Sequence, residues 1–245
     1  MKICSWIIVT ACLCIACCRA CAEERPVALS SQLTANNPGF SLKNDSSEPQ
    51  ALPGFWVTEI PQELKAVMQK FSWRPGCPVP LEDLVHLSVL HWGYDDQIHQ
   101  GELIVHRQLA GEILMIFKEL LAATFPLEKI RLIDAYQGDD DLSMADNNSS
   151  AFNCRLSTGS RKKFSKHSYG LALDINPLVN PYVRKGTVLP PAGRSFLDRE
   201  QAIKGMIRKG DPCHRAFIKR GWSWGGAWKN SKDYQHFEKN VQSIQ

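Results

Sequence analysis

The segment Ser165-Lys166-His167-Ser168-Tyr169-Gly170-Leu171-Ala172-Leu173-Asp174 joins a polar loop to a strand. From Leu171 onwards every second residue is apolar, which is the period of a β-strand. Gly170 lies where the loop must turn into this strand, and a residue without a Cβ makes such a turn easy. The segment therefore predicts a loop that carries a histidine, His167, followed by a strand that ends in an aspartate, Asp174.

These two side chains are suited to binding a metal. Imidazole nitrogen and carboxylate oxygen are good ligands for zinc, and a catalytic zinc usually takes three protein ligands and a water. The missing donor is expected in Asp233-Tyr234-Gln235-His236-Phe237, where Asp233 and His236 are three positions apart. One of them can bind the metal while the other lies beside the metal-bound water. A single His-x6-Asp pair is more often an ordinary pair of polar residues, so the second pair carries the argument.

The two segments together resemble a known family of zinc peptidases. The pattern Ser-x-His-x-x-Gly-x-Ala-x-Asp, followed far downstream by Asp-x-x-His, is similar to that of the VanY-type D-alanyl-D-alanine carboxypeptidases and L-alanyl-D-glutamate endopeptidases, which cut bacterial cell-wall peptides. The resemblance extends from about Trp73 to Phe237. Every fixed position of the pattern is matched, by Ser165, His167, Gly170, Ala172, Asp174, Asp233 and His236.

The resemblance implies a fold and a role for each site residue. The expected fold is a small α+β domain with a central antiparallel sheet and flanking helices, over residues 55–245. His167, Asp174 and His236 would hold Zn²⁺. Asp233 would accept the proton of the attacking water, and Arg155, with the metal, would stabilise the oxyanion. A surface arginine without a catalytic role is the competing interpretation of Arg155.

The resemblance also narrows the function to hydrolysis of amide bonds in peptidoglycan peptides by a zinc peptidase, which we expect to be monomeric. Asp233 stands where some relatives carry a glutamate, and this favours an endopeptidase over a carboxypeptidase. Two alternatives are a non-catalytic, zinc-containing module that binds the cell wall and a secreted domain with a structural zinc.

Residues 1–22 have the features of a secretory signal peptide. Lys2 provides the positive charge, an apolar run follows over 3–16, and Ala20-Cys21-Ala22 is a good cleavage site. The run is shorter than the roughly 20 residues of a membrane span, so we expect no transmembrane segment in the mature chain. The protein is thus expected to be exported to the periplasm or the extracellular space. A lipoprotein anchored through Cys17 or Cys18 is the less favoured alternative.

The mature chain is expected to begin with a polar linker over residues 23–54, which shows no apolar period. The whole chain of 245 residues has a net charge of +4, which is not typical of a nucleic-acid-binding protein. The short basic run Arg161-Lys162-Lys163 is most simply a solvated loop, although it could also contact an anionic cell-wall peptide or polymer.

The cysteines outside the predicted signal peptide are Cys77, Cys154 and Cys213. Export permits a disulfide. Cys77 lies in a Pro-Gly-Cys-Pro turn and Cys154 at the end of the long polar loop, both within the region of resemblance, so we predict that they are paired. Cys213 lies in the first turn of a predicted helix and is expected to remain a free thiol. The alternative is three free, partly buried thiols. Because Cys154 directly precedes Arg155, this bridge would help to hold Arg155 over the metal.

The remaining pattern predicts a few elements around the site. Tryptophans 222, 224 and 228 either line a cleft or, for two of the three, pack in the core. The expected elements are a helix over 61–70, a hairpin of strands 87–94 and 98–105, a helix over 107–124, a strand over 130–136, a long polar loop over 137–165, a turn-rich loop over 176–193 beside the cleft, and a helix over 211–220.

Overall fold

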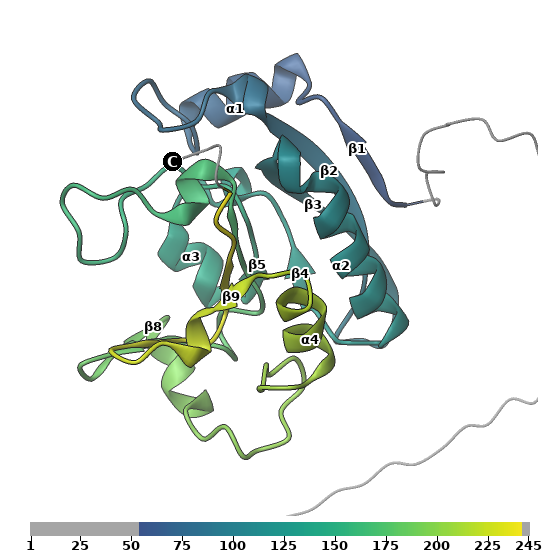
Figure 1. The fold of residues 1–245 in the computed structure, drawn as a ribbon, viewed down its shortest axis with the longest axis vertical. Helices are drawn as coiled ribbons and strands as arrows, with labels where there is room; N and C mark the ends of the chain where they lie inside the picture. The colour runs from purple at the N-terminus through teal and green to yellow at the C-terminus, as the bar shows by residue number, and fades with distance from the viewer. Residues whose placement is uncertain (1–53, 242–245) are drawn as a thin grey trace, which may run out of the picture. The chain divides into compact units, whose positions relative to one another are not determined.

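The structure is a computed structural model, which describes residues 54–241 of the chain (Figure 1). It mixes helices with small, mainly antiparallel sheets, in agreement with the expected α+β class. The strands are divided among several short sheets rather than collected in one central sheet. Within residues 54–241, no helix has the length and hydrophobicity needed to cross a membrane. The predicted signal peptide and nearly all of the predicted linker lie outside the described residues.

The first layer is an antiparallel sheet of β1 (Trp56–Thr58), β2 (Leu84–Trp92) and β3 (Ile98–His106). Strands β2 and β3 form the predicted hairpin, and each is slightly longer than predicted. Helix α2 (Ala110–Ala122) lies along the sheet (Figure 1) and contacts β2. The core between sheet and helix includes Val85, Leu87, Val89, Ile113, Ile116 and Phe117, all buried.

All three predicted helices are present. Helix α1 (Gln62–Lys70) has its predicted bounds to within one residue. The predicted helix over 107–124 divides into a 3-10 turn, Arg107–Leu109, and α2. Helix α4 (Pro212–Ile218) begins with Asp211 as its cap, since Asp211 Oδ1 accepts a hydrogen bond of 2.7 Å from the His214 backbone N–H. Capping chemistry is local, so the start of α4 could be predicted from sequence alone.

A second antiparallel sheet carries much of the candidate site. It consists of β6 (Ala172–Asp174), β11 (His236–Glu238) and β9 (Ser223–Trp224), with β11 in the middle. The register places Asp174 opposite His236. Two segments that are 62 residues apart in sequence therefore meet on neighbouring strands.

A third sheet lies beside it and contains β10 (Lys232–Asp233), β7 (Tyr182–Arg184) and β8 (Thr187–Leu189). Strands β7 and β8 form a hairpin within the segment that we predicted as a turn-rich loop. Its turn residues Lys185 and Gly186 both have positive φ angles, 48° and 81°, as the tight turns of hairpins require. The register places Asp233 opposite Tyr182, so this hairpin is joined directly to the site.

Two sequence-based expectations were wrong. The strand predicted over 130–136 is reduced to β4 (Lys129–Ile130), which pairs in parallel with β5 (Asn148–Ser149), and Ile133–Tyr136 forms a 3-10 turn. A short apolar run has no period that separates these conformations. The loop over 137–165 contains helix α3 (Asp140–Ala145), whose first turn is capped by the side chain of Asp139.

Candidate metal centre

The structure brings His167, Asp174 and His236 together, and all three are buried. His167 Nε2 lies 3.1 Å from Asp174 Oδ2, and His236 Nδ1 lies 3.0 Å from Asp174 Oδ1. The two imidazoles face each other through His167 Nε2 and His236 Nδ1, at 3.2 Å. One ligand atom from each residue lies within 4.8 Å of the others, so the cluster could hold a metal ion.

His167 is positioned by local backbone structure. It belongs to a 3-10 turn, Lys166–Tyr169, and the Ser165 side chain accepts a hydrogen bond from its backbone N–H. Gly170 ends the turn with φ +66°, and a Cβ at this position would lie 2.4 Å from the His106 backbone nitrogen. Any larger residue would therefore displace the turn from β3, which explains the glycine of the motif.

Hydrogen bonds to the outer nitrogens indicate which imidazole atoms face inward. His167 Nδ1 lies 2.5 Å from the Ala151 carbonyl oxygen and so donates to it. His236 Nε2 lies 3.2 Å from Glu238 Oε2 and donates to that carboxylate. The inner nitrogens then carry lone pairs, and they converge with the carboxylate of Asp174. With the inner imidazole nitrogens unprotonated, the three converging acceptors form a donor set that fits zinc.

The electrostatics of the cluster also favour positive charge. Burial opposes the ionised form of Asp174, but His167 and His236 outweigh it and hold the Asp174 pKa far below its usual range. Burial lowers the pKa of His236, yet hydrogen bonds to Asp174 and Glu238 raise it to about 10. The site thus stabilises an added cation, either as protons on the imidazoles or as a metal ion.

Asp233 lies next to this cluster, on β10. Its Oδ1 atom is buried and has no hydrogen-bond partner among the described residues. Burial raises the Asp233 pKa to about 7, and the charge of Asp174 adds to this effect. A Cβ at Gly225 would lie 2.7 Å from the Asp233 Cβ and 3.3 Å from the His236 Cβ, so the glycine allows close packing behind both residues. An unpaired carboxylate of this pKa beside a metal site is suited to exchanging protons.

Arg155 lines the same cavity as the metal cluster, which favours the site interpretation over a simple surface arginine. Its guanidinium Nη2 lies 2.8 Å from Asp140 Oδ2, an ion pair in which both side chains are about three-quarters buried. Its backbone is fixed through Ser168, whose Oγ accepts from the Arg155 N–H at 2.9 Å and donates to the Arg155 carbonyl at 2.7 Å. Ser168 is in the turn that carries His167. The hydrogen bonds of Ser168 to the Arg155 backbone therefore join the segment of the arginine to the turn of the histidine.

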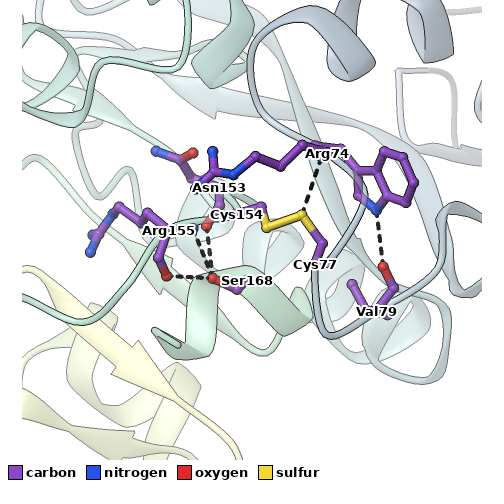
Figure 2. The surroundings of a disulfide bond; sticks show 8 residues. Arg74, Cys77, Val79, Asn153, Cys154, Arg155 and Ser168 are labelled. Carbon is purple, nitrogen blue, oxygen red and sulfur yellow. Dashed lines mark hydrogen bonds between the residues drawn. A yellow bond between two sulfur atoms is a disulfide. The ribbon is translucent and has the colours of Figure 1, made fainter. Parts of the chain in front are cut away.

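The predicted disulfide between Cys77 and Cys154 is present (Figure 2). Cys213 is a buried free thiol, as predicted. The backbone N–H of Cys154 also donates to the Ser72 carbonyl at 2.9 Å. Figure 2 shows the bridge on one side of the segment before Arg155 and Ser168 on the other. The segment is thereby fixed at two points, of which only the bridge was expected from the sequence.

The cluster opens into a cavity of about 550 Å³. Trp228 lines it, and its ring centroid is 5.4 Å from that of His236. Trp222 and Trp224 are buried in the core instead, so the second interpretation of the three tryptophans is the correct one. Helix α3 and the β7–β8 hairpin also contribute wall residues, among them Asp140, Met144, Tyr182 and Leu189.

Sequence reasoning missed Glu238 and Asp140. Glu238 follows His236 by two positions on β11, so both side chains lie on one face of the strand. This period-2 relationship could have identified Glu238 as the partner of the histidine. No local signal identifies Asp140 as the partner of Arg155, because the two residues lie on α3 and on a loop 15 residues later.

Comparison with known families agrees with this site. Residues 158–239 match the family model described as D-alanyl-D-alanine carboxypeptidase, which confirms the family resemblance over this part of the chain. The matched span contains His167, Asp174, Asp233 and His236, whereas Arg155 lies just before it. A search of curated proteins and a search of solved structures each gave no match. The family match supports peptidase activity on cell-wall peptides.

Proposed function

We propose that the protein is a zinc-dependent peptidase that hydrolyses amide bonds in the peptides of peptidoglycan. The observation that carries the proposal is the convergence of three acceptor atoms, from His167, Asp174 and His236, beside the Asp233 carboxylate, whose Oδ1 atom has no partner among the described residues. The family match supports the peptidase class and the type of substrate. The three residues would hold zinc, which supplies Lewis-acid activation of water and of the scissile carbonyl when it is bound.

Asp233 is the proposed general base. A carboxylate with a pKa of about 7 can accept the proton of the attacking water near neutral pH and then donate it to the leaving amine. Its free Oδ1 atom has no competing hydrogen bond to break before it accepts the proton. The absence of such competition supports Asp233 over Glu238, which is already engaged by His236.

Arg155 is the proposed oxyanion donor. Its guanidinium lines the cavity, and one N–H group of the fork is held by Asp140 while others remain available. A donor directed at developing negative charge contributes about 3 kcal/mol to the stability of a transition state. Asp140 would keep the planar group in a fixed orientation.

We further propose endopeptidase rather than carboxypeptidase action, because the base is an aspartate at the Asp-x-x-His spacing. The export of the protein after cleavage of residues 1–22, to the periplasm or beyond, is part of the proposal. Intact mass measurement of the exported form tests it: a chain that begins at Glu23 is expected, and a lipid-bearing Cys17 or Cys18 would contradict it. A non-catalytic wall-binding module would have no use for an unpaired base at Asp233.

The decisive experiment is digestion of purified peptidoglycan with the mature, zinc-loaded protein, followed by mass spectrometry of the released fragments. The fragment masses identify the bond that is cut. Asp233→Asn serves as the matched control, since it preserves shape but cannot act as a base. Intact peptidoglycan after treatment with a correctly folded, zinc-loaded protein would refute the proposed function.

A further inference from the structure

Charge is distributed very unevenly along the chain. Between Arg155 and Leu197 the only acidic residue is Asp174. The rest of the chain holds 21 of the 29 basic residues and 24 of the 25 acidic ones. The segment 155–197 therefore carries a strong positive charge that the small net charge of the whole protein conceals. Its basic residues are Arg155, Arg161, Lys162, Lys163, Lys166, Arg184, Lys185 and Arg194.

The fold gathers six of these residues around the mouth of the cavity. We call Arg161, Lys162, Lys163, Lys166, Arg184 and Lys185 the basic rim. The loop that holds the first three is closed by a bridge between Leu156 and Phe164. Arg184 and Lys185 lie at the end of the β7–β8 hairpin. The two parts meet, since a Cβ at Gly159 would lie 3.6 Å from Arg184 Nη1.

The charge of the basic rim is not neutralised by the protein. Within residues 54–241, none of the six forms an ion pair with a carboxylate. Five acidic groups line the cavity. Asp140 and Glu238 are engaged by Arg155 and His236, and Asp174 by the two histidines of the cluster. The remaining two, Asp141 and Asp233, form no ion pair with the basic rim. Like charges that lie close together without partners destabilise the folded state. The clustering of these residues is therefore not explained by a contribution to stability. Binding of a negatively charged partner does explain why these charges lie together.

The arrangement also indicates the size of that partner. Lys163, Lys166 and Arg184 line the cavity, whereas Arg161, Lys162 and Lys185 are exposed outside it. A single small anion inside the cavity would use only the inner three. A partner that engages both groups must extend from the cavity across the loop and the hairpin.

We propose that the basic rim binds a polyanionic polymer, which carries carboxylate or phosphate groups in series and bears the peptide that enters the cavity. The identity of the polymer as a substrate rests on the proposed function, but its binding does not. The positive field would concentrate the polymer at the site and would be weakened by salt. The rim thus selects peptides attached to a charged matrix over free peptides.

The test is binding of two fluorescent probes, poly-glutamate and linear polyphosphate, to the zinc-loaded mature protein, measured by anisotropy at low and high salt. The rim variant removes the outer charges, Arg161→Ala, Lys162→Ala and Lys185→Ala, none of which lines the cavity. The control variant removes three exposed charges elsewhere, Lys70→Ala, Arg74→Ala and Lys209→Ala. Equal circular dichroism spectra establish that both variants are folded.

We expect salt-sensitive binding of at least one probe, and the probe that binds identifies the charged group. The rim variant should bind it about tenfold more weakly, and the control variant should bind like the unmodified protein. Equal affinity of the two variants, or no binding of either probe at low salt, would overturn the inference. Tighter binding of a single-stranded DNA oligonucleotide of equal charge would overturn the assignment to a substrate polymer.

Hydrolysis assays separate this inference from the proposed function. On intact peptidoglycan the rim variant should show a raised KM, and on a short soluble wall peptide it should keep the kcat of the unmodified protein. Polymer binding that depends on the rim, without any hydrolysis, would refute the peptidase proposal and leave the rim as a binding surface. Normal hydrolysis without rim-dependent binding would refute the proposed role of the basic rim and leave the peptidase proposal intact.

Discussion

Asp174 and His236 lie opposite each other on the adjacent antiparallel strands β6 and β11, with Asp174 Oδ1 3.0 Å from His236 Nδ1. This register fixes two of the three proposed ligands on one rigid ladder. The third, His167, is added by the turn that leads into β6. The candidate metal centre is therefore set by backbone pairing rather than by flexible side chains, and its proposed properties can be tested residue by residue.

The first prediction concerns the metal. The purified mature protein should contain about one zinc per chain, and His167→Ala should lose most of it, because two remaining ligands do not hold a catalytic zinc. Elemental analysis by mass spectrometry measures the content. His99→Ala is a matched control, since His99 is partly exposed and pairs with Asp95 away from the cluster. Full zinc occupancy in His167→Ala would remove this residue from the ligand set.

The second prediction concerns the base. Asp233→Asn should retain zinc and fold but lose hydrolysis by a factor of about 10²–10⁴, the usual contribution of a general base. Asp141→Asn, at another carboxylate of the cavity wall, is the control and should retain most activity. An unchanged rate in Asp233→Asn would show that another group accepts the proton.

The pH dependence follows from the same residue. Burial raises the Asp233 pKa to about 7, and a base is active only in its deprotonated form. The rate should therefore fall as the pH drops through this pKa. A bound cation would lower the pKa, so the acidic limb is expected at or below pH 7. Rate profiles of kcat/KM between pH 4 and 9 measure it, and a flat profile over this range would contradict the assignment.

The third prediction concerns Glu238, which accepts a hydrogen bond from His236. Its removal should weaken zinc binding by about 10–100-fold, because the carboxylate fixes the tautomer and orientation of the ligand histidine. Competition with a chelator measures this for Glu238→Ala, and Glu238→Gln, which keeps an acceptor, should restore part of the affinity. Glu102→Ala, which removes a similar partner from His86, is the control. Equal zinc affinity in all three variants would assign Glu238 no positioning role.

The fourth prediction concerns the disulfide. Replacing Cys77 and Cys154 by serine should lower the free energy of unfolding by about 4 kcal/mol, the chain-entropy value for a bridge that spans 77 residues. Zinc content should be unchanged, while kcat should fall because the segment before Arg155 loses the bridge and keeps only its bonds to Ser168 and the Arg155–Asp140 ion pair. Denaturant unfolding and the zinc assay separate these effects. A double variant with normal kcat would show that Ser168 and Asp140 hold Arg155 without the bridge.

Thiol mapping tests the same bridge chemically. One alkylatable thiol, Cys213, is expected in the oxidised, denatured protein. In the native protein it should react slowly, because burial raises the Cys213 pKa well above its usual value and keeps the thiolate rare. Three reactive thiols in the natively exported protein would contradict the disulfide.

The parts of the structure that could be predicted from the sequence are those with a local cause. Each of three features follows from a pattern of residues within one segment: the Asp211 cap, the apolar stripe along α2, and the hairpin of β2 and β3. His167, Asp174, Asp233 and His236 could be predicted because their motif is specific. Whether they bind zinc and transfer protons stays a prediction.

The parts that could not be predicted depend on contacts between distant segments. The pairing of Arg155 with Asp140 requires α3, which polar sequence did not indicate. The segment 130–136 adopts a short strand and a 3-10 turn, because pairing with β5 extends over only two residues. The gathering of the basic rim likewise requires the β7–β8 hairpin to approach the loop at Gly159.

The pairing of β7 with β10 has a consequence for how this scaffold can change. The register that sets Tyr182 opposite Asp233 ties the base to the root of the hairpin, whereas Arg184 and Lys185 lie at its tip. Insertions beyond Lys185 would leave that register intact, and insertions before Tyr182 would shift the carboxylate away from the cluster. Mutational drift can thus change the length and charge of the hairpin tip, where we propose that a polymer binds, while the root beside Asp233 admits almost no variation in length.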